Sequence, residues 1–353
     1  MRIAQIETWR EDIPLTRPYE IAFRRTDSVG NVFVRLIPEH GEAGLGCAAP
    51  EHHVTGETLD DCVAALDVAG LDWLQGADVR ELPRLLRELA GHLPDTPAAR
   101  AAIDMALHDL LARQLDIPLV RLLGQCQQAL PTSITIGIMS LEETLEEAQE
   151  YFERGFRYLK VKTGQDVEAD IARLQALRQR YGDQIHIRVD PNQGYDESAL
   201  LHFLRQTEDC NLEFVEQPLP VSSNMRALPR SVQDQLAADE SLLSPNDALQ
   251  LAAPPRACGI FNIKLMKCGG LGPARRIGEI AELAGIDLMW GCMDESRISI
   301  AAALHAAMAA PNTRYLDLDG HLDLAKDPAR GGFTLDQGIL KPGTDAGLGV
   351  YLD

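Results

Sequence analysis

The sequence lacks the features that mark membrane, secreted and nucleic-acid-binding proteins. It has no apolar run near the roughly 18 residues that a membrane span needs. Its opening residues, MRIAQIETWREDIPL, alternate like a strand instead of forming a signal peptide. Positive charge is scarce, with 33 Lys and Arg against 53 Asp and Glu and a net charge of −20. We therefore expect no nucleic-acid partner and no membrane partner, and the negative charge serves either solubility or attraction of a cationic substrate.

Cysteine is present but forms none of the usual motifs. The seven cysteines are odd in number, scattered along the chain and never spaced as C-x-x-C. We therefore expect neither a disulfide framework nor a zinc site, and a reducing cytoplasm fits this usage.

The pattern of the chain changes at about residue 125. Residues up to about 60 read as strands, with turn-forming residues 38–41 between two apolar runs. Residues 58–123 read as helices, most clearly in PAARAAIDMALHDLLARQL, where apolar side chains recur at helical spacing. We predict an α+β N-terminal domain over residues 1–125.

Short apolar strands then alternate with amphipathic helical stretches as far as residue 320. This alternation predicts a (β/α)8 barrel of the TIM type over residues 126–320, although the helical link before the fifth strand is weak. The segment 321–353 is rich in Gly and Asp, and we expect it to fold back over the N-terminal domain. The eight strand candidates are 133–138, 158–163, 185–190, 212–217, 235–240, 260–265, 287–292 and 314–319.

Charged residues end six consecutive strand candidates. A charge inside an apolar strand is costly unless it is paired or binds a metal, and a barrel carries its chemistry at the C-terminal ends of its strands. From Lys162 the successive steps are 28, 26, 23 and 25 residues, close to one strand–helix unit each. The residues reached by these steps are Lys162, Asp190, Glu216, Asp239 and Lys264.

Three of these residues predict a metal site. Asp190, Glu216 and Asp239 end adjacent strands and offer only carboxylate oxygens. Hard oxygen ligands favour Mg²⁺ or Mn²⁺, with the remaining positions left to water and substrate. Asn192 and Glu240 follow two of the carboxylates closely, and we expect them to orient these ligands.

The lysines predict proton transfer. Lys160 and Lys162 alternate with Val161, so both point to one side of their strand, into the barrel mouth. Their mutual repulsion and a nearby divalent cation are expected to lower a lysine pKa toward the range of a general base. Lys264 lies four strands further on and so faces Lys162 across the ring, which is the arrangement of a racemase or epimerase. Lys267 is an alternative acid, but it is expected to begin a loop.

These residues resemble the enolase superfamily, specifically its muconate-lactonising subgroup. The resemblance spans nearly the whole chain and rests on the motifs LKVKTG (159–164), RVDPNQG (188–194), VEQPL (215–219), ADES (238–241) and NIKLMKCGGL (262–271). It implies a capping N-terminal domain and a Mg²⁺ ion at the barrel mouth, since enzymes of this superfamily pair a Lys or His base with Mg²⁺. Glu295 also matches the pattern after the seventh strand, with a supporting role near Lys264.

Within the subgroup the chain is most similar to dipeptide epimerases, which are isomerases. Asp317 and Asp319 point the same way at the end of the eighth strand. In dipeptide epimerases such a D-x-D motif holds the free amino group of the substrate, which needs charged acceptors. Thr135 is expected to contact the substrate from the first strand. The alternative is that the two aspartates are a solvated strand end.

The preferred side chain is open between two classes. Glu51, Asp294 and the negative net charge favour a cationic dipeptide containing Lys or Arg, which we prefer. Arg24 favours the acidic side chain of an alanyl-glutamate epimerase. His52 and His53 lie beside Glu51 and are expected to be solvated loop residues.

Three rival functions remain open from the sequence. A succinylbenzoate synthase or an N-acylamino acid racemase would use the same lysines and metal but would leave Asp317 and Asp319 idle. A catalytically silent barrel that only binds a ligand is the alternative from another class. Barrel enzymes with capping domains commonly form homo-oligomers, and we expect this option here without a motif that specifies it.

Overall fold

The capping domain is built from a long antiparallel hairpin and a set of helices. The computed structural model describes residues 1–21 and 24–353, with side chains described outside residues 18–26. A three-stranded antiparallel sheet runs in the order β1 (Ile3–Ile21), β2 (Arg24–Pro38) and β3 (Gly44–Ala48). The helices that follow are α1 (His52–Thr55), α2 (Leu59–Ala65), α3 (Leu82–His92), α4 (Pro97–Gln114) and α5 (Leu119–Leu123).

Helix α4 forms the centre of this domain because it is buried on nearly every side. Its alanines leave room for β3 to lie directly on it. A Cβ at Gly46 would come within 1.8 Å of the Ala102 carbonyl oxygen, and one at Gly44 within 2.2 Å of the Ala106 oxygen. Two glycines in one strand thus allow a close strand-on-helix contact that any side chain would prevent.

Eight parallel strands form the barrel. They are hydrogen-bonded in sequence order, which confirms the predicted barrel, and all lie within the predicted strand segments except β12, which begins one residue earlier, at Thr313. The ring closes where Thr132 pairs with Leu316 and the Ser133 amide donates to the Leu316 carbonyl at 3.0 Å. The strands are β5 (Ile134–Ile136), β6 (Tyr158–Lys162), β7 (His186–Asp190), β8 (Leu212–Glu216), β9 (Leu236–Ala238), β10 (Ile260–Ile263), β11 (Asp287–Gly291) and β12 (Thr313–Asp317).

The connecting helices are regular except at two places. The link before β9 holds a short 3-10 turn, η5 (Met225–Ala227), and a short α-helix, α9 (Arg230–Gln233), which explains its weak helical pattern. Within the described residues no α-helix follows β12; a short 3-10 turn, η6 (Gly320–Leu322), stands there instead. The other helices are α6 (Leu141–Glu153), α7 (Val167–Tyr181), α8 (Glu197–Gln206), α10 (Pro245–Ala252), α11 (Leu265–Cys268), α12 (Leu271–Ala284) and α13 (Arg297–Ala309).

The C-terminal segment returns to the capping domain. The Leu348 amide donates to Asp109 Oδ1 at 2.6 Å, and Arg113 on α4 donates to the Val350 carbonyl at 2.6 Å. These contacts agree with the expected return of the tail, while the domain limits at 125 and 320 stay a prediction. Its strands are β13 (Ala329–Gly331), β14 (Phe333–Asp336), β15 (Ile339–Pro342) and β16 (Val350–Leu352), and β15 also pairs with β4 (Leu130–Pro131).

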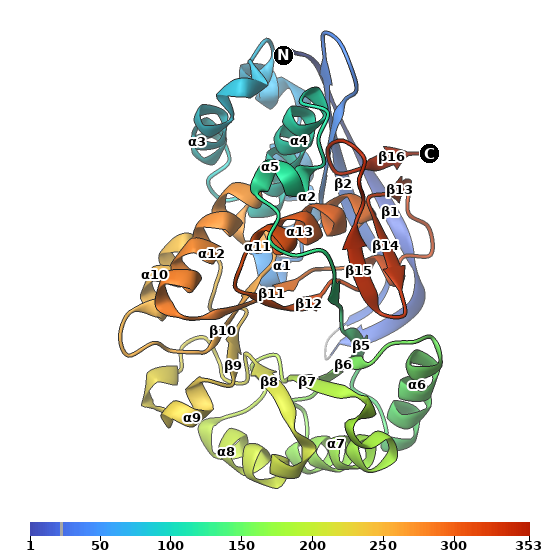
Figure 1. Cartoon of the computed structure of the whole chain (residues 1–353), viewed down its shortest axis with the longest axis vertical. Coiled ribbons are helices and arrows are strands. Elements are labelled where there is room, and N and C mark those ends of the chain that lie inside the picture. Colours follow the sequence, from blue (N-terminus) through green and yellow to red (C-terminus); the bar gives the residue numbers. More distant parts are fainter. Residues whose placement is uncertain (22–23) are drawn as a thin grey trace.

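The capping domain contacts the barrel at several points. The β1–β2 hairpin runs down beside the barrel (Figure 1), and Arg17 near its tip pairs with Glu150 of α6 at 2.7 Å. Asp104 of α4 accepts hydrogen bonds from the first amides of α12, at Leu271 and Gly272. The hairpin and α4 are therefore fixed to the barrel through its helices α6 and α12. Among the described residues, every helix is too short or too polar to cross a bilayer.

Candidate functional site

Lys160 lies at the centre of the charged groups in the barrel mouth. Its Nζ is 3.0 Å from Asp190 Oδ2, 2.8 Å from Glu216 Oε2 and 2.8 Å from Asp317 Oδ2. Burial alone lowers the pKa of Lys160, but these three carboxylates together raise it well above its ordinary value. Lys160 is thus held as a cation, and it joins β6 to β7, β8 and β12.

Lys162 lies two residues further along β6, nearer the C-terminal end of the strand, and is more exposed than Lys160. Its side chain is 29% exposed, and its Nζ donates to Asp190 Oδ2 at 2.8 Å and to Asn192 Oδ1 at 2.9 Å. The strand register pairs Lys162 with Asp190 directly. The two lysines of β6 therefore differ: Lys160 is buried among carboxylates, and Lys162 can reach a bound molecule.

Lys264 stands on the opposite side of the ring, directly after β10. In the order of the eight-stranded ring, β10 lies four places from β6. Lys264 Nζ is 2.8 Å from Asp239 Oδ2, and its side chain is 10% exposed. Gly291 at the end of β11 leaves space for it, since a Cβ there would lie 3.0 Å from Lys264 Cε. The structure thus brings Lys162 and Lys264 to the mouth from opposite sides.

The pKa of Lys264 is raised, as is that of Lys160. Burial lowers this pKa, as does the charge of Lys160, but Asp239 and Glu216 outweigh both and raise it. The lowering expected from the Lys160 and Lys162 pair is likewise not seen at Lys160, whose carboxylates raise its pKa, because the sequence argument counted the lysines and not the carboxylates facing them. A divalent cation on the same carboxylates would weaken this effect.

The three predicted metal ligands are buried at the ends of adjacent strands. Asp190, Glu216 and Asp239 are turned toward lysines, and among the described residues no three acidic, His or Cys side chains already converge on one point. Glu216 Oε2 is nevertheless buried without a hydrogen bond, because its contact with Lys160 is poorly directed. Burial and the charge of Asp190 raise the pKa of Glu216 to about 8, against the effect of Lys160. Crowded carboxylates with one unsatisfied oxygen fit a hard divalent cation.

Lys267 has a supporting position. Its Nζ is buried and donates to the carbonyls of Asp239 at 2.6 Å and Asn262 at 3.1 Å, and also to Asp239 Oδ1. All three partners lie around Asp239 and β10, and the Lys267 side chain is 1% exposed against 10% for Lys264. This placement supports Lys264 over Lys267 as the acid. The sequence signal for Lys267 is its position three residues after Lys264, in what is a short helix and not a loop.

Asp317 and Asp319 are buried at the seam between β12 and β5. Their exposed fractions are 5% and 7%, which excludes the alternative of a solvated strand end. Asp319 Oδ2 accepts from the Thr135 amide at 2.8 Å. Burial and then the charge of Asp317 raise the pKa of Asp319 to about 7. Although burial opposes it, Lys160 lowers the pKa of Asp317.

The predicted supporting residues lie beside the ligands. The Asn192 amide donates to Asp190 Oδ1 at 2.9 Å, and Asn192 Nδ2 lies 3.5 Å from Glu240 Oε1. Glu295 is buried after β11, where burial raises its pKa to about 7. One oxygen each of Glu240 and Glu295 is buried without a hydrogen bond. The mouth therefore holds unsatisfied acceptors on both sides.

The candidate specificity residues come from the capping domain and the loop after β11. Glu51 is half-buried just before α1, which packs beside α11, the helix that follows Lys264. Asp294 is also half-buried, and its carbonyl accepts from Asn31 of β2 at 3.3 Å. His52 and His53 are exposed, as expected of solvated loop residues. The side chain of Arg24 lies outside the described residues.

Asp323 is a carboxylate that the sequence reasoning missed. It follows η6 and is half-buried, and its carbonyl accepts from Thr16 of β1 at 2.7 Å. Burial, followed by the charges of Asp319 and Asp294, raises the pKa of Asp323 to about 8. Its only sequence signal is the four-residue spacing from Asp319, which means little until the tail is known to turn there.

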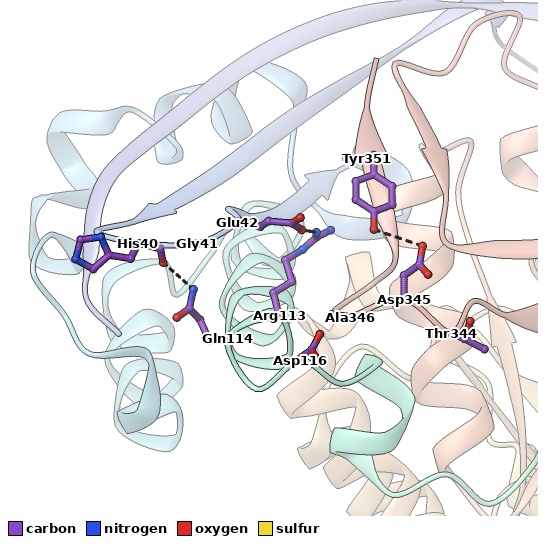
Figure 2. A pocket seen from close by; sticks show the side chains of 10 residues that line it. All are labelled: His40, Gly41, Glu42, Arg113, Gln114, Asp116, Thr344, Asp345, Ala346 and Tyr351. Atoms are coloured by element: carbon purple, nitrogen blue, oxygen red, sulfur yellow. Dashed lines mark hydrogen bonds and ion pairs between the residues drawn. The ribbon is translucent and has the colours of Figure 1, made fainter.

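A second hollow lies away from the barrel mouth. Figure 2 shows it between the β2–β3 turn, the end of α4 and the C-terminal tail, and it contains none of the predicted site residues. Arg113 in its wall is satisfied by Glu42 at 2.6 Å and by Asp109 at 2.9 Å. We interpret it as the junction between the tail and the capping domain.

Comparisons with known proteins agree with this geometry. Residues 4–124 match the family model "Mandelate racemase / muconate lactonizing enzyme, N-terminal domain", and residues 143–353 match "Enolase C-terminal domain-like". The chain is 59% identical to an L-Lys-D/L-Arg epimerase of Methylococcus capsulatus, covering 100% of both chains. It is 51% identical to an L-Lys-D/L-Arg epimerase of Desulforapulum autotrophicum, over 99% of each chain. A crystal structure of the dipeptide epimerase from M. capsulatus with Mg and the dipeptide L-Arg-D-Lys aligns with a TM-score of 0.97 at 59% identity, covering 99% of each chain.

Proposed function

The chain belongs to the mandelate racemase / muconate lactonizing enzyme family of the enolase superfamily, and on that premise we propose a Mg²⁺-dependent dipeptide epimerase that prefers cationic dipeptides. The observation that carries the proposal is the pair of lysines, Lys162 and Lys264, brought to one mouth from opposite strands of the ring. The stereocentre that changes is the Cα of the second, C-terminal residue.

Asp190, Glu216 and Asp239 would hold the Mg²⁺ ion, with Asn192 and Glu240 orienting them. When bound, the ion supplies positive charge to the substrate carboxylate, which makes the neighbouring Cα–H more acidic. The related structure that contains Mg and a dipeptide supports this choice of ion, and Mn²⁺ is the alternative with the same ligand preference.

The proton transfer is assigned to the two opposed lysines. Lys162 removes the proton from one face of Cα and Lys264 returns a proton to the other face; the roles reverse in the reverse reaction. Lys160, held as a cation by its three carboxylates, adds positive charge beneath the reacting carboxylate. Glu295 supports Lys264 from the loop after β11.

The other end of the mouth is assigned to the charges of the substrate. Asp317, Asp319 and Thr135 would hold the free amino group, as charged acceptors around an ammonium do. Glu51, Asp294 and also Asp323 supply negative charge for Lys or Arg side chains. Both relatives above are named for Lys and Arg, which favours cationic dipeptides over an L-Ala-D/L-Glu epimerase.

The test is a dipeptide library incubated with Mg²⁺ in D2O, read by mass and by chiral analysis of the C-terminal residue. We expect deuterium uptake and inversion for L-Arg-L-Lys and L-Lys-L-Arg, and weaker turnover of L-Ala-L-Glu. N-acetylated dipeptides serve as the matched controls, since a succinylbenzoate synthase or N-acylamino acid racemase would leave free dipeptides unchanged. If no compound takes up deuterium at Cα, the epimerase is contradicted and the catalytically silent, ligand-binding barrel is the function that remains.

The cellular location and the oligomeric state are proposed on fewer observations. All seven cysteines are free thiols in the structure, which suits the reducing cytoplasm that the sequence suggests. Assembly into a homo-oligomer remains a prediction, to be tested by light scattering.

A further inference from the structure

A guanidinium is buried on the floor of the barrel, below the catalytic lysines. Arg188 lies two residues before Asp190 on β7, so it points to the same side of the strand. It is 1% exposed, and the rings of Tyr158, Phe214 and Tyr315 lie 5.0, 5.6 and 5.2 Å from its guanidinium carbon. Its charge is paired at Nε with Glu213 Oε2 at 2.7 Å, which leaves the Nη groups to be accounted for, and the mechanism above does not use them.

The guanidinium reaches the seam where the barrel closes. Arg188 Nη1 donates to the Leu316 carbonyl at 2.6 Å and to Ser133 Oγ at 3.1 Å. Arginine has donors only, so the Ser133 oxygen must accept this hydrogen bond. Of the two acceptors near the one hydroxyl hydrogen of Ser133, Asp317 Oδ1 at 2.6 Å is charged and closer than the Leu316 carbonyl oxygen at 3.2 Å, so we assign the hydrogen to Asp317.

The two aspartates of the seam therefore have different partners. Asp317 accepts from Ser133 on one oxygen and from Lys160, at 2.8 Å, on the other. Asp319 accepts from the Thr135 amide on Oδ2, and among the described residues no Lys or Arg forms an ion pair with it. Asp317 is engaged on both oxygens and paired with a cation, while Asp319 has no cation beside it within ion-pair distance.

We propose that Arg188 and Ser133 are positioning residues for the amino group of the substrate. Through Ser133, Arg188 holds Asp317 against Lys160, so that Asp319 is the carboxylate that receives the ammonium and Asp317 supports it from below. This inference rests on the proposed function and gives the two aspartates unequal roles.

The central test compares Ser133→Ala with the wild-type enzyme on two substrates. One is L-Arg-L-Lys, and the other is its analogue without the amino group, 5-guanidinopentanoyl-L-lysine, which keeps the reacting Cα. For the free dipeptide we expect KM to rise about tenfold, as for a lost hydrogen bond to a charged group, with kcat changed less than about threefold. For the analogue, KM should stay within about twofold.

The control variant is Ser133→Thr, which keeps the hydroxyl and should restore most of the affinity for the free dipeptide. Melting temperatures of both variants separate a general loss of packing from the specific effect. An equal rise of KM for both substrates, or no rise for either, overturns the inference.

Asp319→Asn and Asp317→Asn give a second measurement that does not depend on the folding of the Ser133 variants. We expect Asp319→Asn to weaken binding of L-Arg-L-Lys, measured by calorimetry, more than it weakens binding of the analogue. The excess should be larger than for Asp317→Asn, and the reverse order overturns the inference. A wild-type enzyme that turns over neither substrate contradicts the proposed function, whereas an active wild type with an indifferent Ser133→Ala contradicts only this inference.

Discussion

From β6 to β10 each predicted metal-binding carboxylate contacts a lysine, whereas around β11, β12 and the tail the carboxylates outnumber the cations near them. Asp190 and Asp239 have two lysine contacts each. Across the mouth, Asp319 and Asp323 have pKa values raised to about 7 and about 8. We assign the first region, the lysine-paired half, to the proposed metal and proton transfer. The second region, the acidic half, carries negative charge among the described residues that either protonation or an incoming cation would neutralise.

The largest effect should come from removing the metal, which acts on the lysine-paired half alone. Dialysis against EDTA is expected to abolish epimerisation completely, because the substrate carboxylate then loses the charge that acidifies Cα. Added Mg²⁺ should restore the activity, and Mn²⁺ should substitute for it. Activity that persists after dialysis, with metal content checked by atomic emission, would contradict the assignment of Asp190, Glu216 and Asp239.

The next effect should come from the two opposed lysines. Lys162→Ala and Lys264→Ala are each expected to reduce epimerisation by about 10³-fold or more, within the range for loss of a general acid or base. Calorimetry should show that both variants still bind Mg²⁺. Full activity in either variant would end the two-lysine mechanism.

A smaller and selective effect is expected in the acidic half. Glu51→Gln should raise KM for L-Arg-L-Lys by about tenfold and for an alanine-containing dipeptide by less than about twofold, because only the former pairs with the lost charge. Glu39→Gln is the matched control, since Glu39 is an exposed carboxylate at the end of β2. Equal effects of Glu51→Gln on both substrates would refute its role in specificity.

The smallest effect should be a pH dependence of binding. Asp319 and Asp323, with pKa values of about 7 and about 8, are partly protonated at neutral pH, and a cation beside them favours the ionised form. Binding therefore releases protons, and affinity for L-Arg-L-Lys should rise several-fold between pH 6 and pH 8. Calorimetry in two buffers of different ionisation enthalpy counts these protons, and Asp323→Asn should lower the number. Proton uptake on binding would show that the acidic half does not meet the cationic groups.

The sequence predicted the lysine-paired half better than the acidic half. The steps of 28, 26, 23 and 25 residues reach Lys162, Asp190, Glu216, Asp239 and Lys264 because each step is one repeat of a barrel, and charges in apolar strands are conspicuous. No repeat indicates Asp323, Ser133 or Lys267. Asp323 lies on a tail that replaces the eighth helix, and the other two matter only through partners that are distant in the sequence.

The pKa of the lysines shows a further limit. Whether a lysine pKa is raised or lowered depends on which charged groups lie near its amine across the ring. The sequence gives the order of the strands but not the distances between these groups. For Lys264 the facing carboxylates, Asp239 and Glu216, outweigh the other lysine. The side chain of Arg24, the strongest sequence argument for an acidic substrate, lies outside the described residues, so the choice of substrate rests on Glu51, Asp294 and the relatives.

The path of the chain after β12 ties two properties together. Asp319 takes its place at the seam, Asp323 follows one turn later, and Leu324 pairs with Leu15 of β1 before the tail reaches α4. The segment after β12 therefore carries both the aspartate proposed to bind the substrate amino group and a contact with β1 of the capping domain. Exchanging the loop that carries Glu51 should therefore alter the preferred substrate side chain alone. Exchanging the tail should change both the contacts with the substrate amino group and the packing of the capping domain.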